Sequence, residues 1–262
     1  MYTKEELKKQ LCELGIKSSD TVLIHTSFKA VGGVEGGPDA FIDAFCEYLD
    51  EGLFIVPTHT WANVTKDQPI FDYRTTEPCI GLVPRTAAKR QDGIRSLHPT
   101  HSVWACGRDA EEFVRGEEHS KTPAPVGGSW WKLGNLGAKI LLIGVDHGRD
   151  TYIHAVDEIA ELDDRLDTKS FEVTVIGRNG EKIVHSFTPH GNTGSDNFNN
   201  FEKAFIALGV QKNGKLGDAL VRVVDAAKCR DVLLGIYEKT HENFCMEKGD
   251  IPEWLWKEKC KL

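Results

Sequence analysis

The stretch from Lys139 to Glu158, KILLIGVDHGRDTYIHAVDE, constrains the fold of this chain more than any other. Its first part, Lys139 to Val145, is a nearly unbroken run of Ile, Leu and Val, which is typical of a strand buried on both faces of a parallel sheet. The next residues supply a turn, and Asp150 or Thr151 is suited to cap a following helix. The order strand, loop, helix predicts an α/β fold.

His154 is the candidate catalytic residue on that helix. Residues three and four apart lie on one face of a helix, so we expect His154 beside Asp157 and Glu158. A neutral imidazole oriented by a carboxylate can take a proton from a nucleophile, and ligands bind at the carboxyl ends of strands in open α/β sheets. The spacing is consistent with a general base and its partner, and equally with an ion pair on the helix surface.

The composition is that of an ordinary globular protein. Nothing in the 262 residues divides the chain, so we expect a single domain over residues 1–262. No apolar run is long enough to span a membrane, and the N-terminus predicts a charged amphipathic helix rather than a signal peptide, which indicates a cytoplasmic protein. A net charge of −8 without a basic stripe argues against a nucleic-acid partner and favours a cationic small substrate.

The seven cysteines are scattered and include no Cys-x-x-Cys pair. This pattern argues against a disulfide framework and against a structural zinc site, and we expect reduced, mostly packed thiols. No metal is expected in the function.

Two further predicted strands end in polar or glycine residues. Strand Thr21 to His25 is followed by Ser27, Gly32 and Gly33, where glycine lets backbone amides approach a ligand closely. Strand Gly52 to Pro57 is followed by Thr58. We expect both strand ends to face one crevice, although the glycines also fit a simple turn, since no Gly-x-Gly-x-x-Gly or Walker pattern is present.

The segment from Arg95 to Ser102, RSLHPTHS, is the densest polar cluster in the chain. Its side chains predict an anion-binding surface for phosphate or pyrophosphate. The alternative is a turn that leads into a strand from Ser102 to Cys106. The candidate ligand-binding residues in this segment are Arg95, Ser96, His98 and Ser102.

Other segments complete the predicted order of elements. The polar stretch Ala62 to Gly81 is expected to cross over the crevice, and Phe171 to Phe187 reads as a hairpin with a turn at Asn179-Gly180. Asn199 to Leu208 and Asp218 to Arg222 are expected to be helical. His190 lies in a polar segment and is a second candidate acid or base.

Taken together, these blocks resemble the aminoglycoside 3-N-acetyltransferase family, the acetyl-CoA-dependent antibiotic N-acetyltransferases. The resemblance covers most of the chain, and its most specific block is Arg95-Ser96-Leu97-His98-Pro99-Thr100-His101-Ser102. The other matching blocks are His25-Thr26-Ser27 with its glycines, Val56 to Thr60, Gly127 to Leu133, and Leu141 to Val145 leading to Thr151 and His154.

The resemblance implies a layered α/β/α architecture around a largely parallel or mixed sheet, distinct from the GNAT fold. It implies that Ser27 to Gly33, Thr58 and the block from Arg95 to Ser102 hold the pantetheine and phosphates of acetyl-CoA, and that His154 is the base. The family usually has Glu three residues after this His. Here that position is Asp157, with Glu158 next, so either acid is a candidate partner.

We therefore expect an enzyme that moves an acetyl group from acetyl-CoA to an amine of an aminoglycoside by direct transfer. Two alternatives are a metal-dependent hydrolase built on His59, His98, His101, His154 and Asp157, and a CoA-binding protein without turnover.

A carboxylate-rich entrance is also expected, because acidic residues follow the strand from Lys139 to Val145 and would attract a polycationic substrate. The candidates are Asp146, Asp150, Asp157, Glu158, Asp163 and Asp164; for Asp163 and Asp164 a solvated helix face explains the charges equally well.

Overall fold

The computed structural model describes residues 1–191, 195–240, 244 and 247–257. Cys245 and Cys260 lie outside these residues, and the five described cysteines are all free thiols. No helix in the described ranges is both long and apolar enough to cross a bilayer.

The core is a seven-stranded mixed sheet in the order β4-β5-β2-β1-β6-β10-β9. The parallel strands are β1 (Thr21–Thr26), β2 (Leu53–Pro57) and β6 (Lys139–Ile143), with β1 in the middle. The outer strands β4 (Ile94–Arg95), β5 (Val103–Gly107), β9 (Gln211–Leu216) and β10 (Ala219–Asp225) join by antiparallel pairing. Because β1, β2 and β6 are parallel, their carboxyl ends meet at one edge of the sheet.

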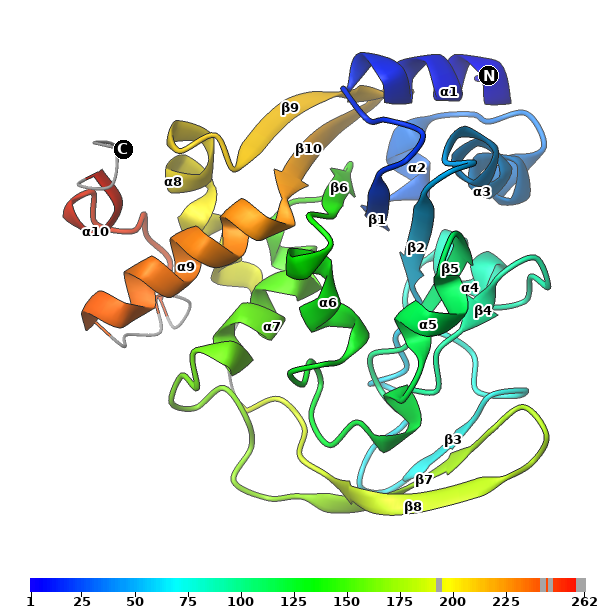
Figure 1. Cartoon of the computed structure of the whole chain (residues 1–262), viewed down its shortest axis with the longest axis vertical. Helices are drawn as coiled ribbons and strands as arrows, with labels where there is room; N and C mark the ends of the chain where they lie inside the picture. The colour runs from blue at the N-terminus through cyan, green and yellow to red at the C-terminus, as the bar shows by residue number, and fades with distance from the viewer. Residues whose placement is uncertain (192–194, 241–243, 245–246, 258–262) are drawn as a thin grey trace.

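Each face of the sheet is covered by helices, which gives the expected α/β/α layering (Figure 1). Alternation along β6 sends Ile140 and Leu142 to one face, and Leu141 and Ile143 to the other, so this strand is buried on both sides. One face packs against α1 (Lys4–Glu13), α3 (Gly37–Tyr48) and α4 (Leu82–Ala87). The other packs against α5 (Ala110–Val114), α6 (Ser129–Asn135), α7 (Thr151–Ile159) and α9 (Ala226–Thr240).

Local signals explain where two of these helices begin. Thr3 and Glu6 form a reciprocal capping box at the start of α1. Asp150 accepts a hydrogen bond from the Tyr152 amide and so caps α7. The cap fixes the first turn of α7 directly after the loop that leaves β6, which places His154 near the sheet edge.

A second, three-stranded sheet lies beyond that edge, at the lower side of Figure 1. It contains β3 (Ile70–Asp72), β7 (Phe171–Ile176) and β8 (Lys182–Phe187), so the predicted hairpin is present. Strand β3 comes from the excursion between Ala62 and Gly81. The excursion and the β7–β8 hairpin together cover this edge of the large sheet.

The helix predicted from Asp218 to Arg222 is wrong, because this segment belongs to strand β10. Gly217, at φ 58°, forms the tight β9–β10 connection, and Ala219 and Val221 alternate with more exposed residues. The remaining segments are the short helices α2 (Phe28–Val31), α8 (Glu202–Ala207) and α10 (Trp254–Lys257) and the 3-10 turns Glu117–His119, His147–Arg149 and Ser195–Phe201.

Candidate active site

A cavity of about 770 Å³ lies at the carboxyl ends of β1, β2 and β6. Its floor is made by residues at or just after the ends of these strands, including Thr26, Ser27 and His59. Its roof comes from the long excursion and the small sheet, through Val64, Phe171 and Phe187 among others. The crevice expected from the two strand ends is therefore present, and the predicted excursion does cross it.

His154 lies in the wall of this cavity and is 9% exposed. Its ring centroid is 4.2 Å from that of His190 and 4.8 Å from that of Phe198, so two rings hold the imidazole. Its Nδ1 atom is buried and makes no hydrogen bond within the described structure. A buried polar atom in a cavity wall that lacks a protein partner is suited to meet a ligand or water.

Neither Asp157 nor Glu158 pairs with His154 in the structure. The Asp157 carboxylate accepts a hydrogen bond from Tyr237 Oη at 2.7 Å and lies 3.2 Å from Arg165 Nη1. Glu158 accepts from Thr122 Oγ1 at 2.6 Å and from the Ala124 amide at 2.8 Å. The three residues share one side of α7, but different tertiary partners draw the two carboxylates away from the imidazole.

His190 is held against His154 by backbone pairing. Segment 165–167 pairs with segment 189–191 through the Leu166–His190 bridge, with hydrogen bonds from the Asp167 amide to the Pro189 carbonyl and from the Gly191 amide to the Arg165 carbonyl. Asp157 contacts Arg165, which lies in the segment that pairs with the His190 segment, so the acid is linked to His154 only through intervening residues.

Five further histidines are held in uncharged form, and all of them except His98 line the cavity. Burial lowers the pKa of His25 to about 4 and that of His98 to about 3. Burial also holds the pKa values of His59, His101 and His190 well below the usual range. At neutral pH these imidazoles therefore add no positive charge that would repel a cationic substrate.

Some of their nitrogens have protein partners and others do not. His59 Nε2 lies 3.1 Å from Thr151 Oγ1, and Trp130 packs beside the rings of His25 and His59. Buried polar atoms without a hydrogen-bond partner in the described structure gather around the cavity: His25 Nε2, Thr26 Oγ1, His59 Nδ1, His154 Nδ1 and both ring nitrogens of His190. The three histidines His59, His98 and His101 do not bring three ligand atoms within 4.8 Å of one another in the described chain.

The residues predicted to hold CoA separate into two groups. Ser27 lines the cavity, whereas Gly32, Gly33, Thr58 and the four candidates Arg95, Ser96, His98 and Ser102 do not. Two other residues of the same block, Thr100 and His101, do line it. The Gly33 carbonyl accepts from the Tyr2 amide at 2.7 Å, and Gly32, at φ 90°, packs against Asp218. The glycines thus fasten the N-terminus to the β9–β10 turn.

The polar atoms of the Arg95 to Ser102 block are engaged within the protein. Arg95 is 4% exposed, and its guanidinium donates to the carbonyls of Thr76 at 2.7 Å and Thr58 at 3.3 Å. Ser102 donates to the Thr58 carbonyl, and Ser96 Oγ accepts from the Val103 amide. His98 Nδ1 accepts from two backbone amides of its own turn, and its Nε2 lies 3.0 Å from the Thr122 carbonyl. The geometry favours the alternative of a turn leading into β5.

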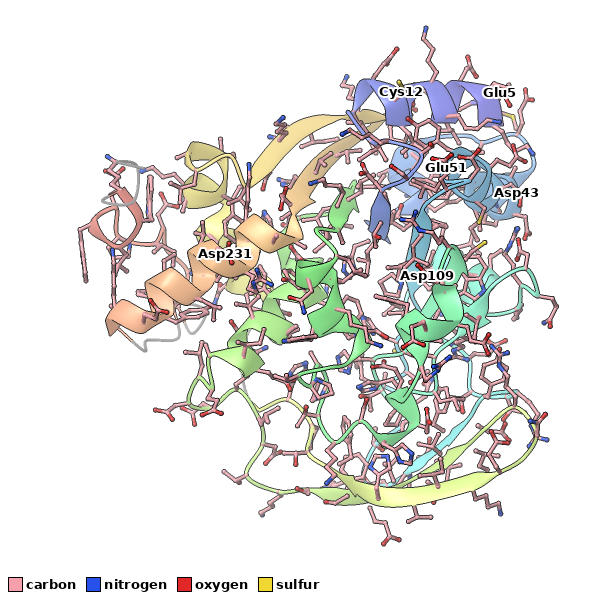
Figure 2. The ribbon with its side chains drawn as sticks, in the orientation of Figure 1. Glu5, Cys12, Asp43, Glu51, Asp109 and Asp231 are labelled. Carbon is pink, nitrogen blue, oxygen red and sulfur yellow. The ribbon has the colours of Figure 1, made fainter. Side chains whose placement is uncertain are left out.

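The expected carboxylate-rich entrance is largely wrong. Of its six candidates only Asp150 lines the cavity, and that side chain is buried and caps α7; Asp167, which was not among them, also lines it. Acidic side chains lie instead on outer surfaces, as Glu5, Asp43 and Asp231 do on α1, α3 and α9 (Figure 2).

The cavity also contains three exposed cations, Lys66, Arg149 and Lys169. Sequence reasoning missed them, because they come from three separate loops and none lies in a recognisable motif. Only the proximity of Arg149 to the end of β6 was a usable signal.

The chain thus combines a mixed α/β/α fold with a histidine-walled cavity at the carboxyl ends of its parallel strands. A family model described as aminoglycoside 3-N-acetyltransferase matches residues 23–238, and the chain belongs to this family. Membership of this family makes the chain an acyltransferase.

Individual relatives and solved structures agree. Aminoglycoside N(3)-acetyltransferase III of Serratia marcescens is 26% identical over 247 residues, covering 84% of this chain and 91% of the relative. Aminoglycoside N(3)-acetyltransferase IV of Salmonella sp is 30% identical over 168 residues, covering 62% and 60%. The structure of AAC-IIIb in a binary complex with CoASH superimposes with a TM-score of 0.79 at 22% identity, covering 91% of this chain and 97% of the other. The aminoglycoside acetyltransferase AAC(3)-Xa superimposes with a TM-score of 0.76 at 26% identity, covering 88% and 90%.

Proposed function

We propose that residues 1–262 form a single acetyltransferase domain that transfers the acetyl group of acetyl-CoA to the 3-amine of an aminoglycoside. The observation that carries this proposal is His154, a cavity-wall histidine with a buried, unpaired Nδ1, in a member of this family. Antibiotic resistance is the proposed outcome in the cell, and the five free cysteines accord with a cytoplasmic location.

His154 acts as the general base. As the substrate nitrogen attacks the thioester carbonyl, the imidazole accepts a proton from that nitrogen. The tetrahedral intermediate then breaks its carbon–sulfur bond, and the imidazolium returns the proton to the leaving sulfur, so that amide and free CoA are formed.

The developing oxyanion requires hydrogen-bond donors in the cavity. Thr26 Oγ1 and His25 Nε2 are both buried and unpaired at the end of β1, where β6 and α7 also meet the cavity. We assign the oxyanion contact to this pair.

Asp157 and Glu158 are positioning residues in this proposal. Asp157 anchors Arg165 and Tyr237, and Glu158 fastens the loop at Thr122 to α7. Asp157→Asn and Glu158→Gln should each reduce kcat less than loss of the base does. If one of them matches the loss caused by His154→Ala while the pH profile of kcat changes, that acid pairs with His154 in the working complex.

The charges of the cavity divide between the two substrates. Lys66, Arg149 and Lys169 are suited to the phosphates of CoA, because they are exposed and not committed to a buried network as Arg95 is. Asp167 is exposed and lines the cavity on the side of the small sheet, where it can attract an ammonium group of the acceptor.

The deciding experiment is a thiol-release assay with acetyl-CoA and a panel of aminoglycosides, simple amines and thioester alone. We expect thiol release that depends on an aminoglycoside and survives excess chelator. Release that the chelator abolishes would favour the metal-dependent hydrolase. Thermal protection by CoA without release on any amine would favour the silent CoA-binding protein.

A further inference from the structure

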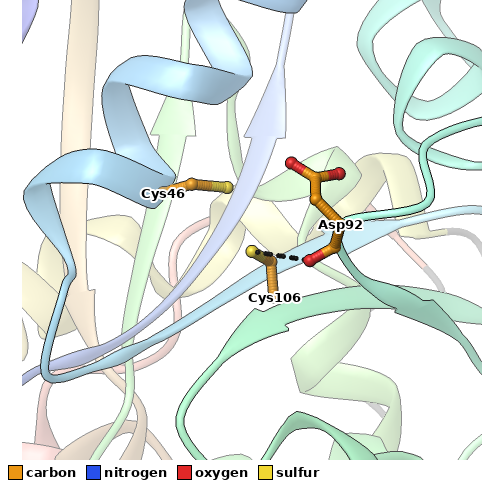
Figure 3. Close-up of side chains that lie close together, drawn as sticks. All are labelled: Cys46, Asp92 and Cys106. Atoms are coloured by element: carbon orange, nitrogen blue, oxygen red, sulfur yellow. Dashed lines mark hydrogen bonds between the residues drawn. The ribbon is translucent and has the colours of Figure 1, made fainter.

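Two cysteines and an aspartate converge near the end of β5 that points away from the cavity. Cys46 lies on α3, Cys106 lies on β5, and Asp92 lies in the turn before β4. Their two sulfur atoms and a carboxylate oxygen of Asp92 all lie within 4.8 Å of one another (Figure 3). Among the residues that the structure describes, this is the only group of three such side chains with this proximity.

The group lies at the opposite end of the sheet from the acyl-transfer cavity. Strand β5 runs antiparallel to β2, and Cys106 pairs with Phe54 near the start of β2, whereas Val103 pairs with Pro57 at its end. The cavity begins at Val56 and Pro57. The three side chains therefore have no part in the transfer reaction.

The chemistry of the three side chains is that of a zinc site. Thiolates and carboxylates are common Zn²⁺ ligands, and tetrahedral coordination at about 2.3 Å places two sulfurs about 3.8 Å apart. Because the three ligand atoms already lie within 4.8 Å of one another, metal binding requires only a small inward movement of the side chains.

The fourth coordination position can be reached from solvent. Both cysteines are partly exposed, Asp92 is exposed, and Asp92 and Cys106 line a hollow that also contains Asp109 and Glu111. A water molecule from this hollow can complete a tetrahedral site.

Arg90 connects Asp92 to two further carboxylates. It donates to Asp92 through Nε at 2.9 Å and also bonds Asp43 at 2.6 Å and Asp39 at 3.3 Å. When Asp92 turns toward a metal ion, Arg90 keeps two other carboxylates. Two thiolates, one carboxylate and one divalent ion leave a net charge of −1, far less negative than the three ionised ligands would be without the metal.

We propose that Cys46, Asp92 and Cys106 bind Zn²⁺ and thereby tie α3 to the edge strands β4 and β5. Binding releases the two thiol protons to solvent, since the thiolate is the ligand. The spacing of the cysteines in sequence gave no sign of this site, because its ligands come from three separate elements.

The first test titrates the reduced, metal-free, full-length protein with Cd²⁺ and follows the thiolate-to-cadmium absorption. We expect saturation at one equivalent and displacement by Zn²⁺. Cys46→Ser and Cys106→Ser should each lose most of the absorption. Cys12→Ser is the matched control, because this cysteine is exposed on α1 (Figure 2), and it should titrate as the wild type does.

A second pair of variants keeps both thiols. Asp92→Asn should weaken Zn²⁺ binding at least tenfold, whereas Asp39→Asn, which removes another carboxylate partner of Arg90, should not. Zn²⁺ should raise the Tm of the wild type and of Asp39→Asn more than that of Asp92→Asn.

Several results would overturn the proposal: no cadmium absorption in the reduced wild type, absorption that persists in the Cys46→Ser, Cys106→Ser double variant, or equal Zn²⁺ affinity in both aspartate variants. A Cys46–Cys106 disulfide formed in air, together with no metal binding after reduction, would also overturn it and make the pair a redox dithiol. Acetyl transfer should be unchanged in Cys46→Ser, so this test is separate from that of the proposed function.

Discussion

The block from Arg95 to Ser102 and the start of α7 carry the same kinds of polar residue but use them in opposite ways. In the block, the side chains of Arg95, Ser96, His98 and Ser102 contact backbone groups inside the protein, and only Thr100 and His101 line the cavity. On α7, His154 faces a cavity of about 770 Å³ with a buried Nδ1 that has no partner in the described residues. Both regions are buried, so burial does not separate them.

The difference teaches that a high density of polar residues does not by itself mark a ligand site. Buried polar groups are costly unless they are hydrogen-bonded, so a cluster whose groups satisfy one another stabilises the fold. A site is marked instead by polar atoms that remain unpaired where a cavity can supply the partner. Four experiments test this distinction.

The largest effect is expected for His154→Ala. Loss of a general base should lower kcat by about 10²- to 10⁴-fold, with thermal protection by acetyl-CoA nearly intact. His119→Ala, at an exposed histidine outside the cavity, is the matched control. Turnover close to that of the wild type in His154→Ala would remove His154 from the chemistry.

Arg95→Ala should act on stability instead. It leaves the Thr76 carbonyl without its side-chain donor, removes one of the two donors to the Thr58 carbonyl and opens a void beside Phe71, so we expect a loss of roughly 3–5 kcal/mol in the free energy of unfolding. The rise in Tm caused by CoA should stay the same size. Arg149→Ala should instead leave the free energy of unfolding nearly unchanged and reduce the rise in Tm caused by CoA. If Arg95→Ala keeps its stability but loses CoA protection, the block does bind phosphate.

Glu117 is a buried acid that contacts groups inside the protein rather than lining the cavity, and its pKa is shifted. Its Oε1 accepts from the Ser129 amide at the start of α6, and burial raises its pKa from the ordinary 4.5 to about 7. The folded state therefore binds the proton of the Glu117 carboxyl more tightly than the unfolded state does. The resulting stabilisation is lost as pH rises from about 4.5 through 7. Relative to Glu117→Gln, the wild type should lose roughly 3 kcal/mol across this range in urea unfolding.

Comparing the pH dependence of unfolding in the wild type and in Glu117→Gln separates the effect of this acid from that of the buried histidines. Their lowered pKa values act in the opposite direction and destabilise the fold as pH falls below about 6.5, but they are common to both proteins. A difference between the two proteins that does not change with pH would show that Glu117 is already ionised in the folded state at pH 5.

The smallest effect concerns salt. If Lys66, Arg149 and Lys169 meet the phosphates of CoA, the KM for acetyl-CoA should rise roughly threefold between low and moderate ionic strength, because exposed charges are screened. The KM for a polycationic aminoglycoside should rise less, since Asp167 is the one exposed carboxylate among the described cavity residues. A steeper salt dependence of the KM for the aminoglycoside would support an acidic entrance instead.

The sequence by itself determined the layers, the main elements and the position of His154. Hydrophobic runs and caps are local, and a buried strand followed by an Asp150-capped helix places His154 at the sheet edge whatever the rest of the chain does. The resemblance to the family could be stated for the same reason, because its motifs are contiguous.

Only the tertiary structure decided which polar groups are engaged. Helical spacing set Asp157 beside His154, but Tyr237 and Arg165, from distant segments, draw the carboxylate away. Arg95 donates a hydrogen bond to the Thr76 carbonyl, and Lys66 and Lys169 line the same cavity. Cys46 on α3 lies close to Cys106 on β5. Each of these contacts joins residues far apart in sequence, and the energy of a polar group depends on its final partners rather than on its neighbours in the chain.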